Sequence, residues 1–385
     1  MQIYLDHSAT TPPHPEVIRL MQQVMVEQWG NPSSLHHWGN RSALTLERSR
    51  IQVSRLINAL PDSIHFTSGG TEANNLAMFG ITQKYQMPQH IIISAIEHSA
   101  ISQPAARLEA EGWVVTRLAV DRTGRIDPKD LQTALRPNTV LVSIIWGQSE
   151  IGTLQPIDEL AAIAHHHGAI FHTDAVQAAG RLAIDVQHTP IDLLSLSSHK
   201  LYGPQGSGAL YVRPDLELVP LIGGGGQESG VRSGTQAVAN IAGFGLAAEM
   251  TVDRMVEENS RLMALRDRLF DLLADTPLMP TGHRLYRLPH HVSFCLPETP
   301  DVSGKELVRQ MNLAGIGISA GAACSSGKIT PSPILVAIGW DEAAAKTGIR
   351  FTLGMGTTEA DVDWTAMVLG QVLERAIVPG RVMRR

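Results

Sequence analysis

The chain has 385 residues, of which 43% are hydrophobic and 18% charged, as in an ordinary soluble globular protein. Its formal net charge of -6 argues against a nucleic-acid-binding protein, because neutralising phosphates requires a cationic face. No apolar run approaches the roughly 20 residues that cross a bilayer, so we expect no membrane partner. A chain of this length favours two domains.

Two features of the sequence favour a cytoplasmic protein. Only two cysteines are present, Cys295 and Cys324, which suits a reducing compartment better than a disulfide framework. The first residues, MQIYLDHSATTPPHPE, lack the charged and apolar regions of a signal peptide. We therefore expect cytoplasmic localisation.

Short β-branched runs alternate with helical patterns from residue 16 to about residue 250. We expect a strand, a Ser-Gly-Gly turn and a helix over 64–80, a helix over 156–168, and strands at 90–96, 139–145, 169–175, 191–197 and 207–212. This alternation predicts an α/β fold whose mostly parallel sheet is covered on both faces. The close spacing of the last two strands allows one antiparallel member.

After residue 250 the pattern changes. Residues 252–276 are periodic at helical spacing with no early proline or glycine, and we expect a linking helix there. Strand-like and helix-like segments then mix, which indicates a smaller α+β domain. We expect a large domain over 16–255, and a small domain formed by 1–15 and 256–385 that carries Cys324.

Several polar residues follow the predicted strands, where ligands bind in open α/β sheets. Asp174 and Gln177 follow one strand, Ser197, His199 and Lys200 follow another, and His98 follows a third. A single polar residue at such a place is most often a solvated loop residue. The convergence of a carboxylate, an amide, histidines and a lysine favours a ligand site.

Pyridoxal 5′-phosphate (PLP) accounts for this set of residues. PLP is an electron sink held by a lysine Schiff base, with an acid against its pyridine nitrogen. Lys200 would form the Schiff base, Asp174 would keep the ring nitrogen protonated, and Gln177 would contact the phenolic oxygen. His98 could stack on the ring and exchange protons, since the ordinary pKa of histidine is about 6.5.

The turn at SGGTEANN predicts a phosphate cradle, because backbone N–H groups at a helix N-terminus bind anions. Thr71 would supply a hydroxyl and Gly70 would allow close approach; the alternative is an N-cap threonine without a ligand. The glycine-rich stretch 221–236 lacks the spacing of a dinucleotide-binding turn. We interpret it as a loop that lets Arg232, Ser233 and Thr235 approach a ligand.

The two cysteines stand in different contexts. Cys295 lies in the apolar run HVSFCLP and fits a buried core residue. Cys324 lies among Ala, Ser and Gly in a stretch without a core pattern, which makes it a candidate nucleophile. The HHH run at 165–167 is not expected to bind a metal, because consecutive helical residues point to different faces.

Eight motifs together resemble one family over almost the whole chain. They are YLDHSATTP, GNPSSLH, FTSGGTEANNLA, EHSA, TDAVQAAG, SSHKLYGPQGSGALYV, RSGT and GAACSSG. In this order they resemble the NifS/IscS-type cysteine desulfurases, which are PLP-dependent enzymes of fold type I in the aminotransferase class V group. The short Cys324 loop resembles the first of the two desulfurase groups. The resemblance implies a large domain with a mostly parallel, seven-stranded sheet.

The resemblance also implies roles for individual residues. Lys200 matches the Schiff-base lysine, Asp174 and Gln177 the ring contacts, and Gly70, Thr71, Ser197 and His199 the phosphate-side contacts. Thr235 matches a threonine that reaches the phosphate from the neighbouring subunit, so a homodimer is implied. Asn31 and Arg350 match groups that receive the substrate carboxylate, and a guanidinium suits that task. One departure is GQSEIG, where Ser149 replaces an asparagine that contacts the cofactor.

The implied activity is PLP-dependent conversion of L-cysteine to L-alanine, with transfer of the sulfur to Cys324 as a persulfide. His98 would exchange the proton of the substrate sulfur. A sulfur-acceptor protein, such as a scaffold for iron–sulfur cluster assembly or a thiolation factor, would then take the sulfur. Two alternatives stay open: another PLP lyase, such as a cystine C–S lyase, and a non-enzymatic PLP-fold binding or scaffold protein.

Overall fold

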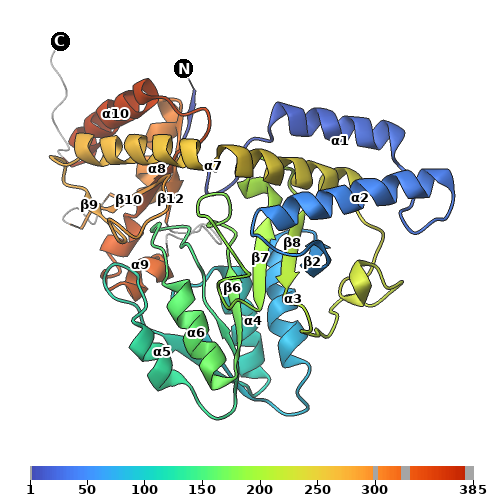
Figure 1. The fold of residues 1–385 in the computed structure, drawn as a ribbon. Helices are drawn as coiled ribbons and strands as arrows, with labels where there is room; N and C mark the ends of the chain where they lie inside the picture. The colour runs from blue at the N-terminus through green and yellow to red at the C-terminus, as the bar shows by residue number, and fades with distance from the viewer. Residues whose placement is uncertain (1, 298–301, 322–329, 378–385) are drawn as a thin grey trace.

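The computed structural model describes residues 2–297, 302–321 and 330–377. Cys324 and the basic stretch RVMRR lie outside these ranges. The described chain forms two regions joined by one long helix, α7 (Val238–Leu272), which runs from the side of α1 (Pro15–Glu27) and α2 (His37–Arg55) to that of α8 (Gly304–Leu313) and α10 (Glu359–Ile377) (Figure 1).

A seven-stranded sheet forms the centre of the larger region. Its strands are β2 (Ile64–Thr67), β3 (His90–Ser94), β4 (Val114–Leu118), β5 (Thr139–Ser143), β6 (Ile170–Asp174), β7 (Leu193–Ser197) and β8 (Gly208–Val212), in the order β2-β8-β7-β6-β5-β3-β4. Strands β7, β6, β5, β3 and β4 are parallel, whereas β8 is antiparallel to both of its neighbours. The predicted α/β sheet with one antiparallel member is confirmed.

Both faces of this sheet are covered, which explains the continuously apolar strands. Ile91 and Ile93 pack with α3 (Gly70–Thr82) and α4 (Ser99–Ala110), whereas Ile92, between them, packs in the cluster that contains residues of α2, α6 (Ile157–His167) and α7. Successive side chains of a strand point to opposite faces, so one run of isoleucines fills two cores. With both faces filled, the strand ends remain for a ligand.

The helix predicted over 156–168 is confirmed as α6. It follows Pro156 and is capped at its C-terminus by Gly168, whose φ of 86° is left-handed, as is common at helix C-termini. The remaining short elements of this region are α5 (Pro128–Ala134) and the 3₁₀ turns η1 (Pro61–Ser63), η2 (Ser198–Lys200) and η3 (Glu228–Gly230).

The prediction for the linking helix was wrong at its start. The helix begins at Val238, 14 residues before the predicted residue 252, and ends at Leu272 rather than 276. Its first half contains Gly243 and Gly245, which the sequence pattern treats as interruptions. They are needed for close packing, since a Cβ at Gly243 would lie 2.8 Å from Met21 Sδ and one at Gly245 2.5 Å from Gln52 Oε1.

The smaller region is built on an antiparallel sheet. Its strands β9 (Met279–Pro280), β10 (His291–Cys295), β12 (Ser319–Ala320) and β13 (Ile349–Thr352) have the order β12-β13-β10-β9, and β1 (Ile3–Tyr4) pairs in parallel with β11 (Ile316–Gly317). A hydrophobic cluster joins residues near the N-terminus, such as Leu5, to the second half of α7. The short elements α9 (Pro333–Ala337) and η4 (Ala344–Lys346) complete this region. No helix in the described ranges is both long and apolar enough to cross a membrane.

Candidate active site

One cavity of about 410 Å³ lies at the carboxyl ends of β6 and β7 and beside the N-terminus of α3. This volume suits a small ligand. Ten predicted site residues line it: Gly70, Thr71, His98, Ser149, Asp174, Gln177, Ser197, His199, Lys200 and Arg350. Residues 8, 9, 74, 145 and 176 complete the lining, and sequence reasoning missed all five. The tertiary structure thus brings most of the predicted set together.

Two predicted site residues, Asn31 and Thr235, do not line this cavity. Asn31 is exposed, and its Oδ1 accepts a hydrogen bond from the backbone N–H of Ser33 at 2.9 Å. Thr235 is also exposed, in the loop before α7. Cys324 lies outside the described residues. The predicted roles of these three residues stay predictions.

Lys200 lies in η2, directly after β7, and its amine reaches across the cavity to the N-terminal segment. Nζ donates to the carbonyl oxygens of Ser8 at 2.5 Å and Ala9 at 2.7 Å. Burial and, after it, the nearby Arg350 lower the pKa of Lys200 to about 8, against the opposite effect of Asp174 and Asp6. About a tenth of the amine is therefore neutral at pH 7, far more than for an unperturbed lysine, and the neutral form is the one that acts as a nucleophile or a base.

Asp174 ends β6 and is 4% exposed. Its Oδ1 accepts a hydrogen bond from Val176 N at 2.9 Å, and its Oδ2 accepts one from Asn74 Nδ2 at 2.7 Å. Both oxygens are thus fixed as acceptors. Asn74 is buried in α3, and a polar residue on the apolar face of a predicted helix was the sequence signal that could have identified it.

The N-terminus of α3 forms an anion cradle. Its N-cap, Gly69, provides no side-chain cap, so no capping side chain occupies the first N–H groups of the helix and they can donate to an anion. A Cβ at Gly70 would lie 2.7 Å from Val176 Cγ2, so the backbone approaches this wall of the cavity closely. Burial lowers the pKa of His199 to about 4, and its neutral ring faces Thr10 Oγ1, with Nδ1 at 3.1 Å.

His98 is the N-cap of α4 and is exposed toward the cavity side of the sheet edge. Its Nδ1 accepts a hydrogen bond from Ala100 N at 3.1 Å. This assignment leaves Nε2 for proton exchange with a ligand. Gln177 is held nearby, where its Nε2 donates to the carbonyl of Ser8 at 2.9 Å.

A second buried acid, Glu97, supports the same edge of the sheet. Its Oε1 accepts from Ser94 Oγ at 2.5 Å and Ile145 N at 2.8 Å, and Oε2 has no partner among the described residues. Complete burial raises the pKa of Glu97 to about 8, and the charge of Asp174 adds to the rise. Sequence reasoning missed this residue because only its neighbour His98 was considered.

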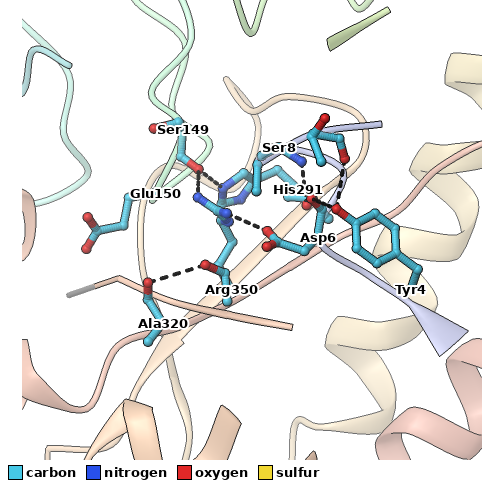
Figure 2. Close-up of polar contacts among 12 residues, drawn as sticks. Tyr4, Asp6, Ser8, Ser149, Glu150, His291, Ala320 and Arg350 are labelled. Carbon is cyan, nitrogen blue, oxygen red and sulfur yellow. Dashed lines mark hydrogen bonds and ion pairs between the residues drawn. The ribbon is translucent and has the colours of Figure 1, made fainter. Parts of the chain in front are cut away.

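Arg350, in β13, brings the smaller region to the cavity. Figure 2 shows its side chain between Asp6 and Ser149. Nη2 lies 2.6 Å from Asp6 Oδ1, and Nη1 donates to the carbonyl oxygen of Ser149 at 3.0 Å. That carbonyl is also 3.0 Å from Nε2 of His291. Ser149 therefore contributes its backbone carbonyl as an acceptor here, and neither of these two contacts depends on its side chain.

Two histidines of the HHH run contact different partners. His165 Nε2 lies 2.6 Å from Asp192 Oδ2, whereas His167 Nε2 lies 2.7 Å from the carbonyl of Arg136, so the two rings face different partners. Within the described ranges, no group of three or more His, Cys, Asp or Glu side chains is placed to hold a metal ion.

The residues of the cavity fit PLP on chemical grounds. A phosphate matches the uncapped N-terminus of α3, and an aldehyde matches the partly neutral amine of Lys200. The carboxylate of Asp174 is rigidly held and matches a pyridine nitrogen.

Comparison with known proteins agrees with this chemistry. Residues 3–364 match the aminotransferase class-V family, to which the chain therefore belongs. This family implies PLP as the cofactor. Within it, the chain is 42% identical to the cysteine desulfurase IscS of Dictyoglomus turgidum over 97% of this chain and 95% of the relative.

Two solved structures show the same fold. A NifS-like protein, at 30% identity, has a TM-score of 0.91 over 97% of this chain and 100% of its own. SspA in complex with cysteine, at 34% identity, has a TM-score of 0.82 over 92% of this chain and 99% of its own. The family that the sequence motifs predicted is confirmed.

Proposed function

We propose that this protein is a PLP-dependent cysteine desulfurase that converts L-cysteine to L-alanine. The observation that carries the proposal is the convergence of Lys200, Asp174 and Arg350 on one cavity, in a chain whose relatives are cysteine desulfurases. These three side chains provide an amine, an anion for a ring nitrogen and a cation for a substrate carboxylate.

When bound, PLP supplies an electron sink next to the α-carbon of the substrate. Lys200, with a pKa of about 8, removes the α-proton, because a base works best when its pKa is near the operating pH. Asp174 keeps the ring nitrogen protonated. Arg350 binds the substrate carboxylate, and Nε2 of His98 exchanges the proton of the substrate sulfur.

Sulfur transfer is assigned to Cys324, from the sequence. Its thiolate attacks the substrate sulfur, so that an S–S bond forms and the C–S bond breaks. The electron pair of the broken bond stays with the substrate carbon, which takes up a proton and leaves as alanine. The step needs no external oxidant, and Cys324 holds the sulfur as a persulfide for an acceptor protein of an iron–sulfur or thiolation pathway in the cytoplasm.

A homodimer belongs to this proposal. Large apolar side chains are exposed in residues 29–44, the segment that contains Asn31: Trp29 at 68%, Leu35 at 95%, Trp38 at 51% and Leu44 at 72%. Exposed apolar surface of this kind is typical of a protein interface. Thr235, which does not reach its own cavity, would complete the phosphate site of the partner. Light scattering of the purified protein tests this, and a monomer would contradict it.

The function is tested by incubating the PLP-loaded protein with L-cysteine and a thiol reductant. We expect equal amounts of alanine and sulfide, and we expect both to disappear in Lys200→Ala. Sulfide accompanied by pyruvate and ammonia instead of alanine would identify a C–S lyase. No turnover by a folded, PLP-loaded protein would contradict the proposal.

A further inference from the structure

The guanidinium of Arg350 is fixed on two sides by groups of this chain. Asp6, which follows β1, holds Nη2 at 2.6 Å, and the carbonyl of Ser149, which follows β5, holds Nη1 at 3.0 Å (Figure 2). The side chains of Arg350 and Asp6 are only 11% and 20% exposed, so water screens this ion pair less than a surface pair. Arg350 thus meets two segments that are distant in the sequence, since Asp6 lies 344 residues from it and Ser149 lies 201 residues from it.

The contacts leave donors for a ligand. A guanidinium has five N–H donors, and two are used by Asp6 and Ser149. Nε of Arg350 is buried and has no partner among the described residues. A buried charged donor without an acceptor is unfavourable, so an acceptor is expected to join it. Arg350 also lines the cavity that holds Lys200, so the N–H groups that Asp6 and Ser149 do not use are the donors available to a ligand there.

Asp6 is itself held in place. Its backbone carbonyl accepts hydrogen bonds from Tyr4 Oη at 3.0 Å and Ala9 N at 3.0 Å, and the residue forms a bridge with Thr352, two positions after Arg350. A long arginine side chain has many rotamers, and Asp6 selects one of them. With its backbone held, Asp6 thus directs the free donors of Arg350 toward the cavity that Arg350 lines.

We propose that Asp6 is a positioning residue for recognition of the substrate carboxylate. It acts through Arg350 and does not contact the substrate. The identity of the substrate as L-cysteine rests on the proposed function, but the positioning itself requires only an amino acid with a free α-carboxylate. If Asp6 instead competed with the ligand for Arg350, its removal would strengthen carboxylate binding.

The test compares two amines that differ by one carboxylate. L-alanine and ethylamine are titrated into the PLP-loaded protein, and binding is followed by the visible absorbance of the cofactor. In Asp6→Asn we expect about tenfold to a hundredfold weaker binding of L-alanine, as loss of a charged hydrogen bond gives, and unchanged binding of ethylamine. For Asp6→Glu, which keeps the charge, we expect L-alanine to bind more weakly than to the unmodified protein and more tightly than to Asp6→Asn.

A matched control is available in the smaller region. Asp363 pairs with Arg268 at the same distance of 2.6 Å but lies on the surface, away from the cavity. Asp363→Asn should leave both titrations unchanged. The positioning role is wrong if Asp6→Asn binds L-alanine as tightly as the unmodified protein does, or more tightly. It is also wrong if the affinities for L-alanine and ethylamine fall by the same factor. Should Asp6→Asn not fold, Asp6→Glu decides: equal effects on both amines overturn the proposal.

The outcome is separable from that of the proposed function. Neither probe carries sulfur, so the ratio of the two affinities can be measured even if the protein releases no sulfide from L-cysteine. Where turnover is observed, Asp6→Asn should raise KM for L-cysteine by the same factor and change kcat less, because the contact serves binding. A fall in kcat with unchanged KM would contradict a positioning role.

Discussion

Asn74 donates a hydrogen bond of 2.7 Å to Asp174, although 100 residues separate the two in the chain. Asn74 comes from α3 and Asp174 from β6, so the contact exists only because the helix packs over the end of the strand. It leaves the carboxylate of Asp174 in one orientation toward the cavity. Its importance can be measured through the proposed role of Asp174.

Replacing Asp174 with Asn should lower the rate of α-proton exchange by roughly hundredfold or more, because a fixed charge next to the reacting group is lost. The exchange of the α-proton of L-alanine in deuterated buffer, followed by NMR, measures this step without sulfur transfer. Asn74→Ala should give a smaller loss. Asn58→Ala, which removes a surface bond to Asp185, is the control. Near-normal exchange in Asp174→Asn would refute its role.

The lowered pKa of Lys200 predicts how fast the PLP-free protein takes up its cofactor. Only the neutral amine attacks an aldehyde, so the rate should rise about tenfold per pH unit below the pKa and level off above it. With a pKa of about 8, the plateau should begin near pH 8. Rapid mixing with PLP, monitored by visible absorbance, measures this. A rate that still rises at pH 10 would show that the amine is unperturbed, and Lys200→Arg should show no such phase.

The two cysteines should differ sharply in reactivity. Cys295 is fully buried, and burial raises the pKa of its thiol to about 12, so the thiolate is absent at neutral pH. Iodoacetamide should therefore modify one cysteine in the folded protein, and mass spectrometry should locate it at Cys324. Cys295→Ala should keep desulfurase turnover, whereas loss of activity in a folded Cys295→Ala protein would give this residue a role.

For Cys324→Ala we expect no persulfide and no sulfide release, with the visible absorbance of bound PLP retained. Persulfide is detected by mass spectrometry of the protein after one turnover. Full turnover by this variant would exclude Cys324 as the sulfur acceptor and favour the lyase.

Glu97 should make the protein less stable as the pH rises. Its pKa is raised from 4.5 to about 8 in the folded protein, so the folded state binds the extra proton between these values. The stability associated with that proton is complete below pH 4.5 and is lost as the pH rises through 8, with a slope of about 1.4 kcal/mol per pH unit. Glu97→Gln, which does not titrate, should remove this slope.

Urea unfolding from pH 5 to pH 8 measures the effect as the difference in unfolding free energy between Glu97→Gln and the unmodified protein. Glu72→Gln is the control, because the pKa of Glu72 is lowered below 4.5 through its hydrogen bonds with Arg232 and Ser68, against the desolvation that raises it. The difference in unfolding free energy between Glu72→Gln and the unmodified protein should stay constant over this pH range. A constant difference for Glu97→Gln as well would show that Glu97 is ionised in the folded protein.

The sequence by itself determined the parts of this protein that depend on local pattern. Continuous apolar, β-branched runs and helices with their caps define the α/β sheet, and the rule that ligands lie beyond strand ends selects Asp174, His98 and Lys200. The motifs identify the family. The glycines in the first half of α7 are the reason that its start was predicted too late. They allow close contact with Met21 and Gln52 on other helices, which no local pattern reveals.

Only the tertiary structure decided which distant groups share the cavity. Asn74 beside Asp174, the carbonyls of Ser8 and Ala9 beside Lys200, and Asp6 beside Arg350 are contacts between segments that no local pattern connects. The pKa of about 8 at Lys200 has the same origin, because burial and neighbouring charges are properties of the packed chain. Residue type and spacing specify what a side chain can do, whereas packing determines its partners and its charge.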